Sequence, residues 1–400
     1  MNHAVRQPYL LVACLLGGLA MAGPMSIDVF VPAIPAIATD LGIGIGHVEL
    51  SLTAIFLGTA LGQIIYGPVS DRYGRKPVAL IAFTLFFISA IGVALADSLG
   101  PLIFWRFIQG LVAASGRILG NAAARDQYEK EQLGRLVSLI FIVSISSSVF
   151  MPLIGGYVAE HHSWRWIFYI MAGYAGFLIL AVLFFFKETL PKKDHHAINP
   201  YSMAVNFTRI VQNKDFLYNT FCGGFAVSGF TAFLTASAGV SKTVFDISPQ
   251  TYSYFFSGAV TVLLITNIYC SRRVERTGLV PLMTAGATIQ FAGGLAMLYF
   301  ALQQSTNPWT IFAPMTIYLM GFALIYAQAV AGAMTPFGRN AGAASSLLGF
   351  LQFTMGALVS ALLAIFVDGT ARPMAIAVAV SAAGSALSLM IYLRHRRRSA

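Results

Sequence analysis

Long apolar stretches separated by short polar ones dominate the pattern of this 400-residue chain. A helix needs about 20 predominantly apolar residues to cross the hydrocarbon core of a bilayer. The pattern predicts twelve such spans, at approximately 9–38, 47–67, 77–96, 99–124, 134–158, 164–186, 214–238, 248–270, 279–302, 308–333, 341–367 and 371–393. A transmembrane β-barrel would instead show short segments of alternating hydrophobicity, so we predict an all-α membrane protein with twelve transmembrane helices.

The composition excludes a soluble protein. Hydrophobic residues make up 57% of the chain and charged residues only 10%. A soluble domain carries about 25% charged residues, so this chain has too few to cover a water-facing surface. The lipid bilayer is therefore its expected surroundings.

Basic residues are distributed unevenly between the two sides of the predicted spans. With both termini in the cytoplasm, 20 of the 25 Lys and Arg residues lie in cytoplasmic segments, and only Arg165, Lys242 and Arg372 lie on the other side. This is the positive-inside pattern, and it requires an even number of spans. The net charge of +10 therefore indicates topology, and we expect no nucleic acid as a partner.

The beginning of the chain imitates a cleavable secretory signal. Arg6, the apolar run Tyr9–Leu19 and the triplet Ala20-Met21-Ala22 have the order of such a signal. The apolar run continues well past the triplet, so we expect an uncleaved first span.

Cysteine and histidine positions predict no metal site. Cys14, Cys222 and Cys270 lie in apolar spans, where we expect them as small buried hydrophobic side chains. His195 and His196 are adjacent, an arrangement in which both cannot easily bind one ion, and a solvated linker is the simpler interpretation.

The longest polar stretch, Lys187 to Lys214, divides the chain into six spans and six spans. We therefore predict a first half at 1–190, a cytoplasmic linker at 191–213 and a second half at 214–400. The segments Asp71–Pro77 and Glu275–Pro281 both have the order acid, Arg, any, Gly, any, any, Pro, each after the second span of its half. Repeated halves that meet around a central cavity are a transporter architecture.

Asp28 is the single charged residue of the first span. A carboxylate in hydrocarbon costs several kcal/mol, so it persists where it faces a cavity, meets a partner or takes up a proton. A group that changes charge inside a membrane is a natural proton carrier. We therefore predict that Asp28 takes part in proton coupling.

Arg106 and Arg117 both lie inside the fourth span. Eleven residues turn a helix by about 1100° and rise about 16 Å, so both guanidinium groups share one face at different depths. That face is expected to line the cavity or a helix interface, with structural anchoring as the alternative role for each arginine.

The segment Gly67–Pro77 (GPVSDRYGRKP) resembles the signature loop between the second and third spans of the major facilitator superfamily. The residue types suit a latch, because Asp71 can accept charge-assisted bonds and Gly74 allows a tight turn. The resemblance implies a cytoplasmic gate made by Gly67, Asp71, Arg72, Gly74, Arg75 and Lys76.

Two further segments resemble motifs of drug/proton antiporters in that superfamily. Arg106–Gly110 (RFIQG) is similar to their intramembrane arginine motif. The fifth span carries Pro152, Gly155 and Gly156 in the order of their antiporter motif, although Met151 and Ser147 replace two of its glycines. Kinking and close helix packing are the expected roles of the three matching residues.

Three stretches resemble the Bcr/CflA (bicyclomycin/chloramphenicol resistance) exporters: Ser26–Pro35, Trp164–Phe168 and Ala341–Gln352. One departure is Ala236–Gly239, where relatives commonly place Ser-Pro. The resemblance implies the major facilitator fold, with two pseudo-symmetric six-helix halves around a central cavity. It also implies a monomer in a bacterial inner membrane that needs no cofactor except protons as the coupling ion.

The expected mechanism is alternating access driven by inward proton flow. Ionised Asp28 would pair with a cavity arginine or a cationic cargo, and protonation from outside would release the cargo. Aromatic and amide side chains suit small amphipathic organic molecules, and two membrane arginines admit neutral or anionic ones. The candidate cavity residues are Gln63, Gln109, Phe221, Phe225, Tyr252, Phe256, Tyr326, Gln328 and Phe353.

Other functions fit the sequence less well. A dedicated exporter of an endogenous metabolite or siderophore would have the same fold. An integral membrane enzyme would need clustered catalytic groups, and the sequence has no nucleophile–base pair or phosphate-binding glycine loop. A passive channel would lack the gate segment and the repeated halves.

Overall fold

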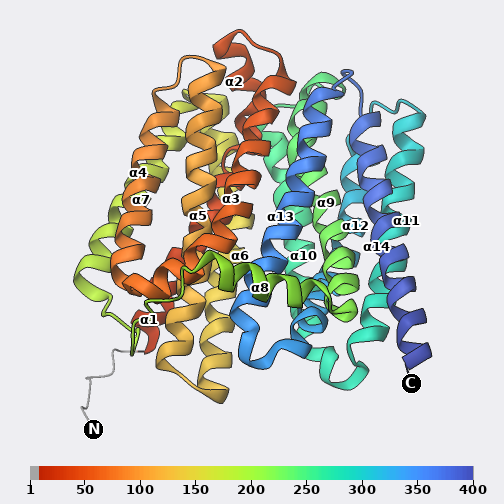
Figure 1. Ribbon diagram of the computed structural model, residues 1–400. Helices are drawn as coiled ribbons and strands as arrows, with labels where there is room; N and C mark the ends of the chain where they lie inside the picture. Colours follow the sequence, from red (N-terminus) through yellow and green to blue (C-terminus); the bar gives the residue numbers. More distant parts are fainter. Residues whose placement is uncertain (1–8, 400) are drawn as a thin grey trace.

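The computed structural model describes residues 9–399, and Arg6 lies outside this range. Every regular element in the described part is helical (Figure 1). The elements are α1 (Tyr9–Asp28), η1 (Val31–Ala33), α2 (Ile34–Leu41), α3 (Ile45–Tyr73), α4 (Arg75–Ala94), α5 (Leu99–Gln127), α6 (Lys130–His161), α7 (Arg165–Phe185), α8 (Pro200–Val211), α9 (Lys214–Thr243), α10 (Pro249–Thr277), α11 (Leu279–Leu302), α12 (Trp309–Met334), η2 (Thr335–Asn340), α13 (Ala341–Ile365) and α14 (Arg372–Ser399).

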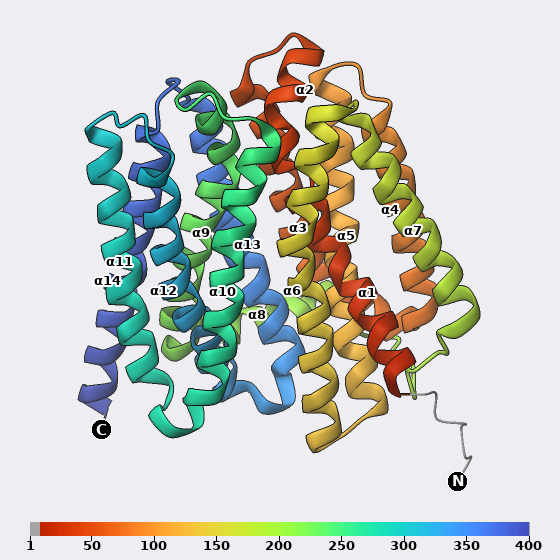
Figure 2. The same cartoon turned by 180° about the vertical axis from the view of Figure 1, so that it is seen from behind.

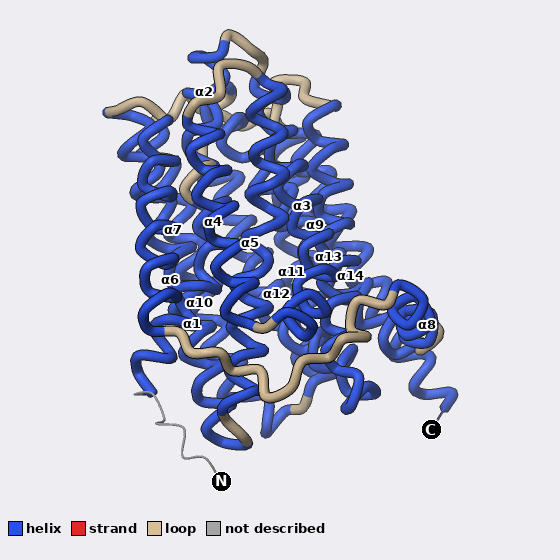
Figure 3. Tube along the Cα trace, turned by 60° about the vertical axis from the view of Figure 1, so that its left-hand side comes forward, coloured by secondary structure: helices blue, strands red, loops and turns tan. Residues whose placement is uncertain are grey.

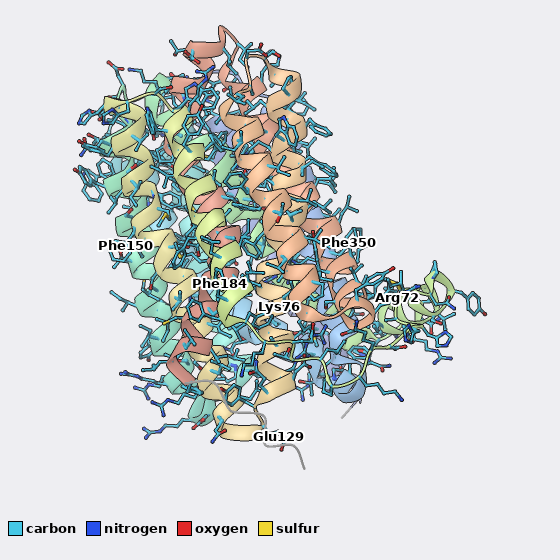
Figure 4. All side chains as sticks on the ribbon, turned by 90° about the vertical axis from the view of Figure 1, so that its left-hand side faces the viewer. Arg72, Lys76, Glu129, Phe150, Phe184 and Phe350 are labelled. Atoms are coloured by element: carbon cyan, nitrogen blue, oxygen red, sulfur yellow. The ribbon has the colours of Figure 1, made fainter. Side chains whose placement is uncertain are left out.

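The twelve predicted spans are confirmed. In the described part, twelve helical segments are long and apolar enough to cross a membrane, and α1, η1 and α2 together form the first of them. Large apolar side chains cover the outside of the bundle, as Phe150 and Phe184 illustrate in Figure 4. Cys222 and Cys270 are buried, but Cys14 is exposed, so the expectation of burial was wrong for that residue. Lipid is a suitable neighbour for its apolar thiol.

The helices pack as two related halves. In the first half α1 packs on α5 and α6, and in the second α9 packs on α12 and α13 in the same way. The contacts α3–α5, α4–α5 and α4–α7 likewise correspond to α10–α12, α11–α12 and α11–α14. Two symmetry-related contacts, α3 with α13 and α6 with α10, join the halves (Figure 2).

The first span is not one continuous helix. Helix α1 ends at Asp28, and the chain passes through η1 before α2 begins. Pro32 explains the position of the break, because a proline ring inside a helix collides with the carbonyl group four residues earlier, here that of Asp28. The break therefore places the carboxyl group of Asp28 at a helix end inside the bundle.

The segment Gly67–Pro77, predicted as a loop, is helical on both sides of a single residue. Helix α3 continues to Tyr73 and α4 begins at Arg75, with Gly74 between them at φ +109°. Gly278 joins α10 to α11 in the same way, at φ +77°. Both values lie in the region that favours glycine, so the two halves share this connection.

The linker contains a helix of its own. Asn199 caps α8 by accepting hydrogen bonds from the backbone N–H groups of Tyr201 and Ser202, and Pro200 occupies the first helical turn. Helix α8 crosses the bundle near the end that carries both termini, which we call the terminal end (Figures 1 and 3). The opposite end is called the far end.

The two halves are in close contact towards the far end. Ser360 of α13 is 2.9 Å from the hydroxyl oxygen atoms of both Thr53 on α3 and Thr235 on α9. The backbone N–H of Gln250 on α10 donates to Oε2 of Glu160 on α6 across 2.9 Å. The halves are therefore closed against each other on this side.

Candidate functional site

A cavity of about 410 Å³ lies between the halves towards the terminal end. Its walls come from both halves and from the linker, and they include Gln63, Gly67, Arg117, Asn121, Met203, Asn206, Phe207, Tyr326, Ser346 and Gly349. The volume lies in the range of sites for small organic molecules. The halves are in contact at the far end, and the cavity lies on the terminal side of these contacts.

Arg117 faces the inner part of this cavity. Its Nη2 donates to Oε1 of Gln63 across 3.4 Å, and it forms no ion pair with any residue that the structure describes. The other charged residues in the cavity wall lie closer to the terminal end, namely Asp71, Arg75, Arg125 and Asp194. A guanidinium group in this position can bind a carbonyl, hydroxyl or acidic group of a cargo.

Asp28 lies between the halves and does not line that cavity. The residue is 5% exposed, and its Oδ2 has no hydrogen-bond partner within the described chain. The carboxyl group lies beside the hydroxyl group of Ser148 on α6 and near Tyr252 on α10. The Tyr252 hydroxyl oxygen is in turn 2.7 Å from that of Ser237 on α9. Polar groups from both halves therefore surround this carboxyl group.

Arg106 is fully buried beside the break of the first span. Its Nη1 donates to the backbone carbonyl of Ser26 and to Oε1 of Gln109, each across 2.7 Å. The guanidinium carbon also lies 4.1 Å from the centre of the Phe30 ring, a cation–π arrangement. These contacts anchor α5 to the last turn of α1, so Arg106 lies at a helix interface, whereas Arg117 faces the cavity.

No ion pair joins Asp28 and Arg106 in the described structure. Two nitrogen atoms of Arg106, Nε and Nη2, are buried without a hydrogen-bond partner, as is Oδ2 of Asp28. Buried polar groups are normally satisfied, so these three atoms make the region around the break unusual within the bundle.

A sequence profile of the major facilitator superfamily matches residues 14–364. This chain belongs to that superfamily. The bicyclomycin resistance protein homolog of Haemophilus influenzae is 30% identical over 360 residues, which are 90% of each chain. Multidrug resistance protein D of Escherichia coli is 28% identical and covers 84% of this chain and 83% of its own. These relatives confirm the resemblance to Bcr/CflA-type drug antiporters.

Solved structures confirm the fold of this superfamily member. A D-xylose–proton symporter matches with a TM-score of 0.76 at 15% identity and covers 96% of both chains. A bacterial homolog of the human lysosomal transporter Spinster matches with a TM-score of 0.73 at 14% identity, over 97% of this chain and 98% of its own. The major facilitator fold follows from these comparisons.

The signature segment of the superfamily is built around the Arg75 side chain. Its Nη1 lies 2.6 Å from Oδ1 of Asp71, and its Nε lies 2.9 Å from Oδ2 of Asp126 on α5. Lys76 Nζ donates to the backbone carbonyl of Leu183 on α7 across 2.9 Å. The segment thus joins α3, α4, α5 and α7 at the terminal end, where Figure 4 labels Arg72 and Lys76.

Glu188, which the sequence analysis missed, completes this network. Its carboxyl group accepts hydrogen bonds from the backbone N–H groups of Arg75 and Lys76 at the start of α4. Partial burial acts to raise the pKa of Glu188, but these bonds and those from the backbone N–H groups of Thr189 and Leu190 outweigh it and hold the pKa below its ordinary value. A Cβ on Gly74 would lie 2.5 Å from Oε2 of Glu188, a second reason for glycine there.

The antiporter-motif glycines of α6 face two different neighbours. A Cβ on Gly155 would collide with the carbonyl oxygen of Val29, directly after the break in the first span. A Cβ on Gly156 would collide with Oγ of Ser253 on α10, across the interface between the halves. Pro152 lies in the same helix, one turn earlier. This part of α6 therefore contacts both the Asp28 region and the second half.

The other candidate residues are dispersed. Of the nine cavity candidates, only Gln63 and Tyr326 line the large cavity. Tyr252 and Phe256 are buried among aromatic rings, and Gln328 donates to Sγ of Cys270. Phe221 is 41% exposed, Phe225 packs beside Gly384, Phe353 packs against the core, and Gln109 holds Arg106.

Proposed function

We propose that this chain exports small amphipathic organic molecules across a bacterial inner membrane in exchange for protons. The proposal extends what the names of the curated relatives say of those proteins to this chain. The observation that carries it is the buried Asp28 carboxyl group, placed at a helix break between two halves that must move against each other.

The proposed orientation places both termini and α8 in the cytoplasm. The distribution of Lys and Arg supports this choice, because 20 of the 25 then lie in cytoplasmic segments. In this orientation the closed far end faces the outside, and the cavity with Arg117 opens towards the cytoplasm. Cargo would enter this cavity from the cytoplasm or the inner leaflet.

The proposed cycle uses Asp28 as the proton carrier. In an outward-open form the carboxyl group meets water and takes up a proton from the acidic outside. Burial without a cationic partner disfavours its ionised form, so the protonated protein closes at the far end. When the bundle opens further towards the cytoplasm than in the described structure, the carboxyl group reaches water and loses its proton. The carboxylate then pairs with a cation, either Arg106 or a cationic cargo. The proton affinity of Asp28 thus differs between the two forms, which is what coupling requires.

Transport by the purified protein in liposomes tests this function. We expect cationic, neutral and anionic amphipathic compounds to be accumulated against a concentration gradient when a pH gradient is imposed, with the acidic side receiving the cargo. A protonophore should abolish the accumulation. Equilibrative flux that ignores the pH gradient would instead identify a passive pathway and would contradict the proposal.

A further inference from the structure

A second buried carboxyl group lies at the far end, on Glu49 of α3. The residue is 2% exposed, and its Oε2 has no hydrogen-bond partner within the described chain. The cycle described above does not use it. Since buried polar atoms in folded proteins are nearly always paired, an unpaired carboxyl group needs a physical explanation.

Glu49 lies in the interface that closes the far end. A Cβ on Gly239 of α9, in the second half, would lie 2.9 Å from Oε1 of Glu49. The carboxyl group borders a small space of about 40 Å³, which is also lined by Ala236, Gly239, Leu363, Thr370, Pro373 and Met374 of the second half. Although the carboxyl group borders this space, only 2% of the residue's surface is exposed, too little to hydrate an ionised carboxylate fully.

The charged groups around this space do not neutralise Glu49. On α9, Lys242 pairs with Asp246. After α13, Asp368 accepts hydrogen bonds from Thr370. Elsewhere at this end, the acidic, basic and histidine residues are His47, Asp97, Glu160, His161, His162, Arg372 and Asp40, which pairs with Arg165. No ion pair involves Glu49 among the residues that the structure describes.

We infer that Glu49 is a second proton-binding site, which must be protonated for the far end to close. In the closed form an ionised carboxylate would be buried against the glycine of the other half without a partner, which is unfavourable. A protonated carboxyl group is neutral and fits. When α3 and α9 separate, Glu49 meets water and ionises readily. Closure of the far end is therefore accompanied by proton uptake at Glu49.

This site has a different role from Asp28. Glu49 lies in the second turn of α3, at the far end, whereas Asp28 lies deeper in the bundle, beside Ser148 near the middle of α6. A proton bound at Glu49 therefore returns to the far side when that end reopens. Glu49 therefore sets the pH at which the far end closes, and it carries no net proton across. Because a closed form binds this proton more tightly, acid on the far side favours closure and alkali favours opening.

Spin-label distances across the far end test the inference without cargo or flux, so the result does not depend on the proposed transport function. Labels on Asp97→Cys and Gln303→Cys, which lie in exposed far-end loops of the two halves, report opening once the three native cysteines are replaced. Asp28→Asn in every sample removes the titration of that carboxyl group. Between about pH 5 and about pH 9, the open-to-closed ratio should rise about tenfold per pH unit over part of the range, as expected for one linked proton.

Adding Glu49→Gln, which keeps the shape of the protonated form, should abolish this slope and leave the far end closed throughout. The matched control is Glu160→Gln, since Glu160 bridges the halves at the same end but is exposed. It should keep the slope. The inference would be overturned if Glu49→Gln left the slope unchanged. It would also be overturned if the labelled Asp28→Asn protein with native Glu49 showed no pH dependence.

Infrared spectroscopy provides a second measurement that does not need the glutamine variant to fold. A protonated-carboxyl band should disappear with the same pH midpoint as opening, and Glu49→Asp should shift that band. If no such band titrates with opening, Glu49 is not the linked proton site.

Discussion

The two halves share a backbone plan but differ in where they bury charge. In the first half Asp28, Glu49, Arg75 and Arg106 are buried. In the described part of the second half, the buried polar side chains are uncharged and belong to Ser, Thr, Asn, Gln and Tyr. Since buried charges are costly, their restriction to one half suits the proposed cycle, in which this half performs the ion chemistry and the other supplies a neutral surface.

The helix connections at Gly74 and Gly278 show the same difference locally. Both glycines have positive φ, and each donates its N–H to the carbonyl group four residues earlier, that of Ser70 or of Val274. The residues that follow Gly74 are Arg75 and Lys76, which enter a charged network, whereas Leu279 and Val280 follow Gly278. The two turns share their geometry and the acid–Arg pair before the glycine, but basic residues follow the glycine only in the first half.

The largest expected effect comes from removing the buried carboxyl group of Asp28 in the first half. Asp28→Asn should abolish accumulation driven by a pH gradient, because the amide cannot take up and release a proton. Asp215→Asn, at the start of α9 in the second half, is the matched control and should retain accumulation. The measurement is concentrative transport in liposomes with equal amounts of each variant. Undiminished accumulation by Asp28→Asn would contradict the assignment of proton chemistry to the first half.

An intermediate effect is expected from the two glycines. A side chain in this backbone region costs about 1–3 kcal/mol, so both Gly74→Ala and Gly278→Ala should destabilise the protein. Gly74→Ala should cost about 1 kcal/mol more, because it also displaces Glu188 from the start of α4 whereas no atom lies within 4 Å of a Cβ on Gly278. Apparent melting temperatures in detergent show which of the two variants is destabilised more. Equal shifts would mean that the Glu188 contact contributes nothing.

The smallest expected effect concerns Glu188 itself. Its pKa is lowered in the folded protein, so its contribution to stability is present above the ordinary pKa of a glutamate and is lost as the pH falls through the lowered folded value. Glu188→Gln should therefore destabilise the protein at neutral pH by about 0.3–1 kcal/mol, the range for an anion at a helix start.

This difference from wild type should shrink as the pH approaches about 4 and below. Glu275→Gln, at the exposed acid beside the turn in the second half, should have no such effect. Thermal unfolding over a pH series distinguishes the two variants. A Glu188→Gln difference that stays constant with pH would contradict the role of the ionised carboxyl group.

Most of the fold could be predicted from the sequence, because apolar runs of spanning length have few alternative structures. The break in the first span and the linker helix have local sequence causes that the pattern of apolar spans does not show. Pro32 determines where α1 ends, and Asn199-Pro200 is a typical start of a helix, here α8. The segment around Gly74 was predicted as a loop but is helical on both sides of this residue. The resemblance to a sequence motif does not show where the helices end.

The site was less predictable, because it depends on contacts between distant segments. Glu188 is 113 positions from Arg75, and nothing near either residue indicates their hydrogen bond. Glu49 lies close to the predicted start of its span, so the sequence did not distinguish it from a solvated acid. Arg106 and Arg117 share a helix, but only the packed structure separates an anchor at α1 from a side chain in the cavity.

Proton release on cargo binding tests the central claim most directly. In weakly buffered detergent solution, at a pH where Asp28 is still protonated, wild-type protein should release about one proton for each cationic cargo molecule bound. Asp28→Asn should bind cargo without releasing any. If the wild-type protein releases no proton at any pH, or if Asp28→Asn releases as many, the Asp28 carboxyl group is not the site at which proton and cargo are exchanged.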